Sequence, residues 1–196
     1  MTRTAVAGTL WPEVSDSHAH SSLRSALSRL DKTARDAVLV TSADLCIGDS
    51  VTVDLRDARK LSHRLLDANA DLEDGDLSAD SVRILSTDLL PDWYDDWVLL
   101  EAENWRQLRL HALESLAGHL LDNGQLGDAA AAAGSAVDAE PLRESARTVL
   151  IRVHLAEGNQ AEAIDEFERY QALLADELGV APSAELRALV DGGAIP

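Results

Sequence analysis

The side chains best suited to contact a ligand are a set of hydroxyl and cationic groups between residues 18 and 34. They recur at steps of three and four, which places them on one face of a helix. The set consists of Ser21, Ser22, Ser25, Ser28, Arg29 and Lys32. Serine hydroxyls donate and accept hydrogen bonds and cations attract phosphate, so this face has the chemistry needed to contact DNA, with Arg29 as the main phosphate or guanine contact. An ordinary solvated, serine-rich helix surface has the same composition, and both interpretations stay open.

Side chains that could support catalysis or metal binding are sparse. His18 and His20 lie two positions apart on the same expected helix and therefore point in different directions, so they do not form a ligand pair. Cys46 lies in an expected strand and is interpreted as a small core residue instead of a nucleophile. We therefore expect no enzymatic activity, no cofactor and no metal site.

The helix that carries the hydroxyl face needs partners to position it. Thr4–Leu10 is predicted to form a short helix with Val6 and Leu10 inward, ending before Pro12. A longer helix is predicted from about His18 to Ala34, and its apolar side chains again recur at steps of three and four: Leu23, Ala26, Leu27 and Leu30. A short helix, a turn and a longer helix with a polar face are typical of a helix-turn-helix.

The next segment changes from helical to extended character. Val38–Val40, Leu45–Ile47 and Val51–Val53 are β-branched or apolar runs, and Thr41–Asp44 can turn between the first two. A small hairpin in this place predicts the wing of a winged helix.

Charge restricts the part of the chain that could approach a polyanion. The 196 residues carry a formal net charge of −18. Residues 1–66 hold nine Lys and Arg against eight Asp and Glu, whereas the remainder holds eight against 27. The first third is therefore the only part expected to approach a phosphate backbone without strong repulsion.

Cysteine content and hydrophobic runs indicate the compartment. Cys46 is the only cysteine, so no intrachain disulfide is expected. The N-terminal residues lack a long apolar signal segment and no run is long enough to span a membrane. We expect a soluble, cytoplasmic protein without membrane association.

A helical second part is predicted to begin at Asp54 with a helix to about Ala68. Residues 69–80 are acidic and poor in large apolar side chains, which predicts a mobile connector or loop. Trp93, Tyr94 and Trp97 precede a long helical pattern and are interpreted as structural plugs at its entry.

Two stretches of the second part repeat one another at a fixed distance. Gly124 and Gly158 lie 34 positions apart, as do Ala129 and Ala163. This is the period of tetratricopeptide helix-turn-helix repeats, although ordinary antiparallel helix packing is an alternative. Apolar stripes agree with the repeat: Leu142, Ala146, Val149 and Val153, then Ala163, Phe167, Tyr170, Leu174 and Leu178.

Four stretches of the second part carry a recognisable combination of residues: 89–98, 106–109, 140–146 and 177–187. Together they resemble the bacterial transcriptional activation domain of the actinobacterial antibiotic regulatory (SARP) family. The resemblance covers roughly residues 54–189 and implies an all-helical, tetratricopeptide-like array. Residues 10–12 and 22–30 are similar to the OmpR-type winged helix that precedes the array in this family. The resemblance to this family also implies binding to direct repeats in promoters and recruitment of RNA polymerase.

Three departures from the family accompany the resemblance. The small N-terminal sheet and first helix of the family's winged helix have no counterpart before Thr4. Asp31 stands where the family places a cation, and the hairpin around Ser42–Cys46 lacks the usual arginine and Gly-Tyr pair. A carboxylate in place of a phosphate-contacting cation is expected to lower DNA affinity and flatten its salt dependence.

We therefore predict a mainly α protein: a partial winged helix-turn-helix with a small β-hairpin in residues 1–53, then a tetratricopeptide-like helical array in residues 54–196. The predicted function is that of a SARP-like transcriptional regulator that binds promoter DNA and contacts RNA polymerase or another regulatory protein, and a homodimer is compatible with the sequence. The alternative is a protein-protein interaction module whose DNA binding is vestigial or absent.

Overall fold

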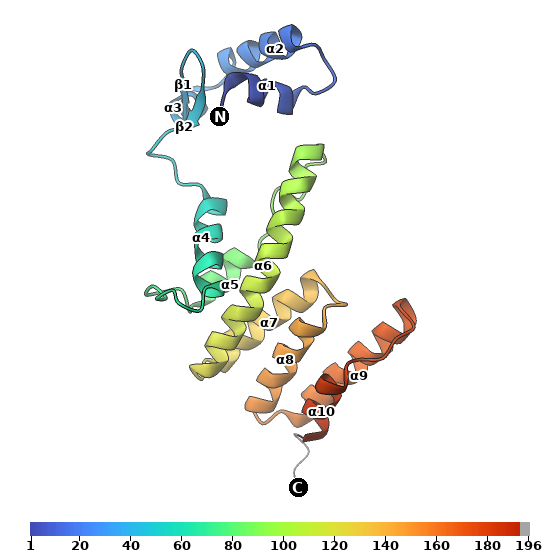
Figure 1. Ribbon diagram of the computed structural model, residues 1–196. Helices are drawn as coiled ribbons and strands as arrows, with labels where there is room; N and C mark the ends of the chain where they lie inside the picture. Colours follow the sequence, from blue (N-terminus) through green and yellow to red (C-terminus); the bar gives the residue numbers. More distant parts are fainter. Residues whose placement is uncertain (193–196) are drawn as a thin grey trace. The chain divides into compact units, whose positions relative to one another are not determined.

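Short helices and one β-hairpin make up the first 54 residues, and a longer series of helices follows (Figure 1). The computed structural model describes residues 1–192. The chain divides into two units, Met1–Asp54 and Leu55–Pro196. We refer to them as the N-terminal unit and the helical unit.

The N-terminal unit contains three helices followed by two strands. They are α1 (Arg3–Leu10), α2 (Asp16–Ser28), α3 (Lys32–Ala37), β1 (Val38–Val40) and β2 (Leu45–Ile47). Ala7 of α1 packs against Ala19 and Leu23 of α2, and partly buried apolar side chains surround this small core: Val6, Trp11, Leu27 and Leu45. Leu10, which we predicted to face inward, is exposed, because α1 is short and turns only one flank toward α2.

The predicted hairpin is present. β1 and β2 are antiparallel, with Leu39 opposite Cys46. The chain start extends this sheet: the backbone N–H of Leu45 donates to the Met1 carbonyl at 2.9 Å, and that of Arg3 to Ala43 at 2.8 Å. The prediction that Cys46 is a core residue is wrong, since its side chain lies on a hairpin face that is open to solvent.

Two further predictions for this unit, one of a strand and one of a helix end, are wrong. Val51–Val53 forms no strand. The helix predicted to continue to Ala34 ends at Ser28, and α3 begins at Lys32. The break has a local cause, because the Asp31 carboxylate accepts the backbone N–H of Ala34 at 2.8 Å and so caps α3 as a new helix.

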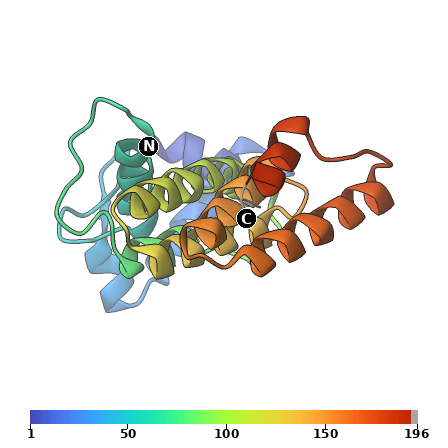
Figure 2. The ribbon, with the colours of Figure 1, turned by 90° about the horizontal axis from the view of Figure 1, so that it is seen from below.

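The helical unit contains seven helices within the described residues. They are α4 (Asp54–Leu66), α5 (Ala79–Leu85), α6 (Asp96–Asp122), α7 (Leu126–Ala139), α8 (Glu144–Ala156), α9 (Gln160–Glu177) and α10 (Ala184–Gly192). Helix α6 packs on α7, α7 on α8 and α8 on α9, so consecutive helices lie side by side (Figure 1). Helix α10 returns to lie beside α8 and α9 (Figure 2).

The predicted repeat is confirmed by the turns as well as the helices. Gly124 and Gly158 adopt positive φ angles of 72° and 78°. The residue after each glycine closes the same turn: the N–H of Gln125 donates to Leu120 and that of Asn159 to His154, both at 2.9 Å. This six-to-one hydrogen bond is the Schellman helix end, which favours glycine at the left-handed position. The α6–α7 and α8–α9 hairpins are therefore two tetratricopeptide-like units.

Small side chains let the helices of the array approach closely. Four alanines of α7 are fully buried against neighbouring helices: Ala129, Ala132, Ala133 and Ala136. A second cluster joins α8, α9 and α10, with Phe167, Tyr170 and Leu174 on the predicted stripe of α9. Leu178, predicted at the end of that stripe, is exposed because α9 ends at Glu177 and the chain turns away.

The acidic segment between α4 and α5 is a loop, but it is anchored and not a free connector. Asp76 is buried and receives two hydrogen bonds from Arg64 of α4, at 2.8 Å and 2.7 Å. The backbone N–H of Glu73 also donates to this carboxylate at 2.9 Å. A bidentate arginine and a backbone donor together satisfy the buried charge, which fixes the loop to α4.

The aromatic residues before α6 differ from our prediction. Trp93 and Tyr94 are exposed, so they are not structural plugs. The aromatic plug is Trp105 inside α6, which is buried and donates its indole N–H to the Thr87 carbonyl at 2.9 Å.

Candidate nucleic-acid interface

The six residues predicted to contact DNA lie on two helices. Four are the serines of α2, and Arg29 is the residue that ends α2. Lys32 is the first residue of α3. The exposed side chains of Ser21, Ser25 and Ser28 follow one another along the solvent-facing side of α2, opposite the buried Ala19 and Leu23.

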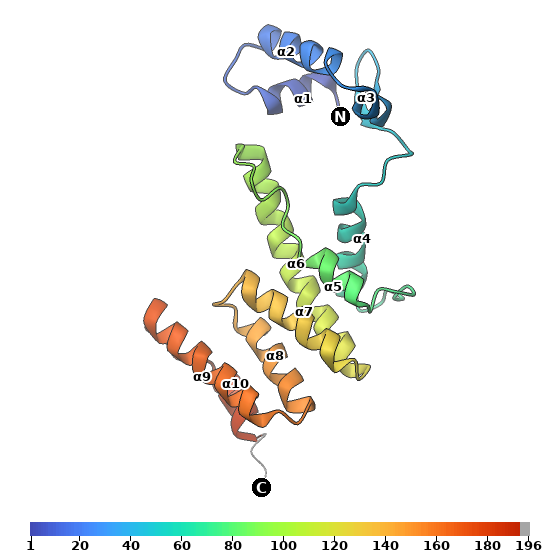
Figure 3. The same ribbon diagram turned by 180° about the vertical axis from the view of Figure 1, so that it is seen from behind.

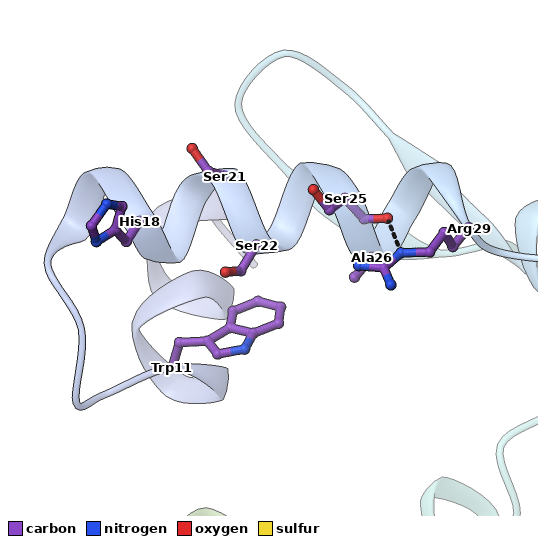
Figure 4. A pocket seen from close by; sticks show the side chains of 7 residues that line it. All are labelled: Trp11, His18, Ser21, Ser22, Ser25, Ala26 and Arg29. Carbon is purple, nitrogen blue, oxygen red and sulfur yellow. Dashed lines mark hydrogen bonds between the residues drawn. The ribbon is translucent and has the colours of Figure 1, made fainter.

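One flank of α2 forms a shallow pocket of about 370 Å³ with the end of α1 (Figure 4). It is lined by Trp11, His18, Ser21, Ser22, Ser25, Ala26 and Arg29. The indole of Trp11 lies beneath Ser22, which is half-buried for that reason. The pocket therefore brings together four of the six predicted residues with the indole of Trp11 and the imidazole of His18.

Hydrogen bonds at the end of α2 orient the predicted contact residues. The Ser28 hydroxyl and the Arg29 Nε–H both donate to the Ser25 carbonyl, at 2.9 Å and 3.1 Å. Within residues 1–192 no hydrogen bond is formed by the two terminal nitrogens of Arg29, which is exposed. One edge of this guanidinium is thus fixed to the helix end while the other faces solvent.

Arg24 also belongs to this surface, although we did not predict it. It is exposed on α2 and donates to the Ser21 hydroxyl at 3.0 Å. Its position three residues after Ser21 was the signal that could have identified it. Arg24 and Arg29 therefore place a cation on each side of the serine row.

The turn between α2 and α3 is stabilised by charged side chains that bind the backbone. The Arg35 guanidinium donates to the Leu30 carbonyl at 2.9 Å. Asp31, the carboxylate that replaces a cation of the family pattern, is directed at the backbone of α3 by its capping bond. The first 54 residues hold five Lys and Arg against seven Asp and Glu, so this unit has a net charge of −2 and its general attraction for a polyanion is weak.

His20 has a structural role. Its Nδ1 lies 2.8 Å from the Asp16 carbonyl and its Nε2 lies 3.2 Å from the Thr4 hydroxyl. A carbonyl can only accept, so Nδ1–H is the donor to Asp16, and Nε2 is paired with the Thr4 hydroxyl. His20 thereby links α1 to α2. Across the part of the chain that is described, no three His, Cys, Asp or Glu side chains converge as a metal site would require.

No helix within residues 1–192 combines the length and the apolar character that a membrane crossing requires.

Comparison with known proteins places the chain in one family. Residues 52–192 match the bacterial transcriptional activator domain. The chain is similar to the regulatory protein AfsR of Streptomyces coelicolor, with 32% identity over 95% of this chain, and to AfsR of Streptomyces griseus, with 29% identity over 95%. It spans about a fifth of the length of these two relatives.

A solved structure shows the same fold. It is Mycobacterium tuberculosis EmbR in complex with a low-affinity phosphopeptide, with a TM-score of 0.63 and 23% identity over 98% of this chain and 54% of that chain. The likeness extends across the N-terminal unit as well as the helical array. Since the family match covers most of the chain, this protein belongs to the bacterial transcriptional activator domain family, a family of SARP-type transcription regulators.

Proposed function

We propose that this chain is a transcriptional regulator whose N-terminal unit binds promoter DNA through α2, and whose helical unit contacts RNA polymerase or another regulatory protein. The observation that carries the proposal is the solvent face of α2, where serine hydroxyls are flanked by Arg24 and Arg29. The similarity to the AfsR proteins over both units supports it.

Under this proposal the groups have different tasks. Exposed hydroxyls on a helix can meet base edges in the major groove, whereas guanidinium groups at its flanks contact phosphates or guanine. Arg29 is held by its Nε–H, which leaves its free edge for a bidentate contact. Lys32 follows at the start of α3, where it can reach the backbone next to the helix end.

The magnitude of the electrostatic contribution is small. If Arg24, Arg29 and Lys32 each neutralise one phosphate, the logarithm of the binding constant falls with the logarithm of salt at a slope of about −3. Because the N-terminal unit has fewer cations than carboxylates, sequence-dependent contacts are necessary for useful affinity at physiological salt.

A fluorescence-polarisation titration tests this proposal. The chain is titrated with promoter fragments of its own gene cluster and with a scrambled fragment, at two salt concentrations. We expect preference for the promoter, and we expect Arg29→Ala to weaken binding and reduce the salt slope by about 1. Arg83→Ala is the matched control, because it changes the net charge equally from an exposed site on α5. Equal binding of both fragments, or equal effects of the two variants, would refute the proposal that α2 recognises the promoter sequence.

A second function, that of a protein-interaction module without DNA binding, has its own supporting observation. The N-terminal unit has more carboxylates than cations, and Asp31 occupies a position where a phosphate contact would be useful. EmbR, whose fold is similar, was solved in complex with a low-affinity phosphopeptide, which supports a peptide-binding function. No promoter binding at low salt by the folded chain would favour this second function.

A further inference from the structure

Exposed apolar side chains gather at the entry to α6. The exposed fractions are 52% for Trp93, 77% for Tyr94, 49% for Leu99 and 65% for Leu100. With Trp97 and the carboxylates of Asp92, Asp95 and Asp96, we name these residues the entry surface. Large apolar side chains that are exposed together in this way mark interaction sites on soluble proteins.

Three apolar members of the entry surface, Trp93, Trp97 and Leu100, are neighbours. The rings of Trp93 and Trp97 lie edge to face with their centroids 6.5 Å apart. Trp97 and Leu100 are three residues apart on α6 and so are neighbours on its surface. Asp96 adjoins Leu99 and Leu100 for the same reason. The segment between α5 and α6 runs beside the first half of α6, which extends past the end of α7 (Figures 1 and 3).

Buried side chains of α6 anchor the start of the segment that leads to this surface. Trp105 fixes Thr87 through its indole N–H, and Arg109 of α6 forms an ion pair with Asp88. Arg109 also donates to the Ser86 carbonyl at 3.3 Å. The entry surface is thus presented by an anchored segment, which lowers the entropy lost when a partner binds.

The backbone of this segment is strained at one residue. Leu90 has a φ of 46° and is the only non-glycine residue among positions 1–192 with a positive value. The left-handed conformation is unfavourable for leucine, because its Cβ comes too close to the following carbonyl oxygen. The N–H of Trp93 donates to the Leu90 carbonyl at 3.0 Å and closes the turn that needs it. Such strain is retained where surrounding structure enforces it, and it concentrates at functional sites.

The charge on the entry surface is unbalanced. In the described residues Asp92, Asp95 and Asp96 form no ion pair, whereas acidic residues further along α6 do: Glu114, for instance, pairs with Arg143 at 2.6 Å. Three free carboxylates next to indole and phenol rings repel phosphate groups and attract cations. A guanidinium or ammonium group can also stack on the exposed face of Trp93 or Tyr94.

We infer that the entry surface binds a segment of a partner protein in which Lys or Arg residues alternate with apolar side chains. This inference rests on the proposed role of the helical unit as the partner-binding part. The apolar residues of the segment cover Leu99 and Leu100, and its cations reach the three carboxylates. A second copy of this chain fits poorly, since a two-fold contact through the entry surface would place the same carboxylates opposite each other.

A peptide titration with the full chain tests the inference. The probe is a short fluorescein-labelled amphipathic peptide of Lys, Arg and Leu, and its binding is followed by fluorescence polarisation and by amide NMR. Two comparison peptides replace Leu by Ser, or Lys and Arg by Glu. We expect the probe alone to bind tightly and to shift amides of residues 90–100. Leu100→Ser and Trp93→Ser should each weaken binding about tenfold.

Charge-matched variants separate the entry surface from the general acidity of the chain. Asp92→Asn with Asp95→Asn removes two charges there, and Asp165→Asn with Glu168→Gln removes two from the exposed side of α9. The first pair should weaken probe binding and the second should not. Equal effects of the two pairs, no binding, or equal binding of the Ser-substituted peptide would overturn the inference.

Two other outcomes concern a second copy of this chain as the occupant and the independence of this test from DNA binding. Sedimentation that shows a dimer abolished by Leu100→Ser would overturn the inference in favour of a second copy as the occupant. No DNA is present in the titration, so its failure leaves the assignment of α2 unaffected, and a failure of DNA binding leaves the peptide result unaffected.

Discussion

Replacing Glu166 by Gln tests whether a buried ion pair holds the second helical hairpin together. Arg147 of α8 pairs with Glu166 of α9, and the side chains are 11% and 5% exposed. The guanidinium lies 5.6 Å from the ring centre of Tyr170, and its Nε and Nη2 both lie 3.3 Å from the Pro141 carbonyl. The pair thereby connects α8 with α9 and with the turn that precedes α8.

The size of the effect follows from burial. Glu166→Gln keeps nearly the same side-chain volume but leaves the Arg147 charge without a carboxylate partner. The two hydrogen bonds from Arg147 to the Pro141 carbonyl are too long to compensate. Removing one partner of a buried pair costs about 3–5 kcal/mol. For a unit of this size, we expect the melting temperature to fall by roughly 10 °C.

Thermal unfolding followed by far-UV circular dichroism measures this change. Arg169→Ala is the matched control, because Arg169 also pairs with Glu166, at 2.5 Å, but its side chain is 67% exposed. Its loss should cost less than about 1 kcal/mol. The combined variant Arg147→Met with Glu166→Met should recover most of the lost stability, since no charge is then left unpaired. A loss below about 1 kcal/mol for Glu166→Gln would refute the reasoning.

Three further predictions concern a turn and two ionisable groups. Gly158→Ala should destabilise the chain by about 1–2 kcal/mol in urea unfolding because its φ is 78°, whereas Gly134→Ala inside α7 meets nothing within 4 Å and should stabilise by about 0.5–1 kcal/mol. The bidentate hydrogen bonds from Arg64 lower the pKa of Asp76. The Asp76 carboxylate therefore contributes its full stabilisation above the ordinary carboxyl pKa range, and this contribution is lost as the pH falls through the lowered pKa. Asp76→Asn should flatten the acidic part of a curve of unfolding free energy against pH. Hydrogen bonds from Arg106 and Gln107 lower the pKa of Glu103 to about 2, and an NMR titration should show it rising toward its usual value in Arg106→Ala.

The helical array could be predicted because its signals are local and repeated. The glycines at 124 and 158 are required by positive φ angles, and a positive φ nearly always selects glycine. The apolar stripe of α9 was predicted for the same kind of reason, since Phe167 and Tyr170 repeat with the helix. Periodicity cannot show where a stripe ends, and so Leu178 was placed one turn too far.

The ion pairs inside the helical unit carry no such signal. Arg64 and Asp76 lie 12 positions apart across a loop, and Arg109 and Asp88 lie 21 apart. A charged residue in an acidic segment is predicted to be solvent-exposed, because the sequence does not show which distant residue tertiary packing brings next to it. The acidic loop was therefore predicted to be mobile, although Asp76 anchors it.

The candidate DNA surface was predicted in part. The serine row and Arg29 depend only on helical spacing, and the structure places them on and at the end of α2. Lys32 was assigned to the same helix because the capping role of Asp31 was not recognised. The exposure of Trp93 and Tyr94 could not be predicted, since aromatic side chains usually lie in a core and only the tertiary structure shows that none covers them.

Site-directed photo-cross-linking tests the central claim, that the solvent face of α2 meets promoter DNA, most directly. Exposed Cys46 is first replaced by Ser, and a cross-linker is then attached to Ser25→Cys on α2 or, as a control, to Glu168→Cys on the exposed side of α9. We expect the α2 probe to cross-link to a promoter fragment, unlabelled promoter to suppress this better than a scrambled fragment does, and the α9 probe to give little product. Promoter binding without cross-linking from α2, or equal cross-linking from both sites, would contradict the claim.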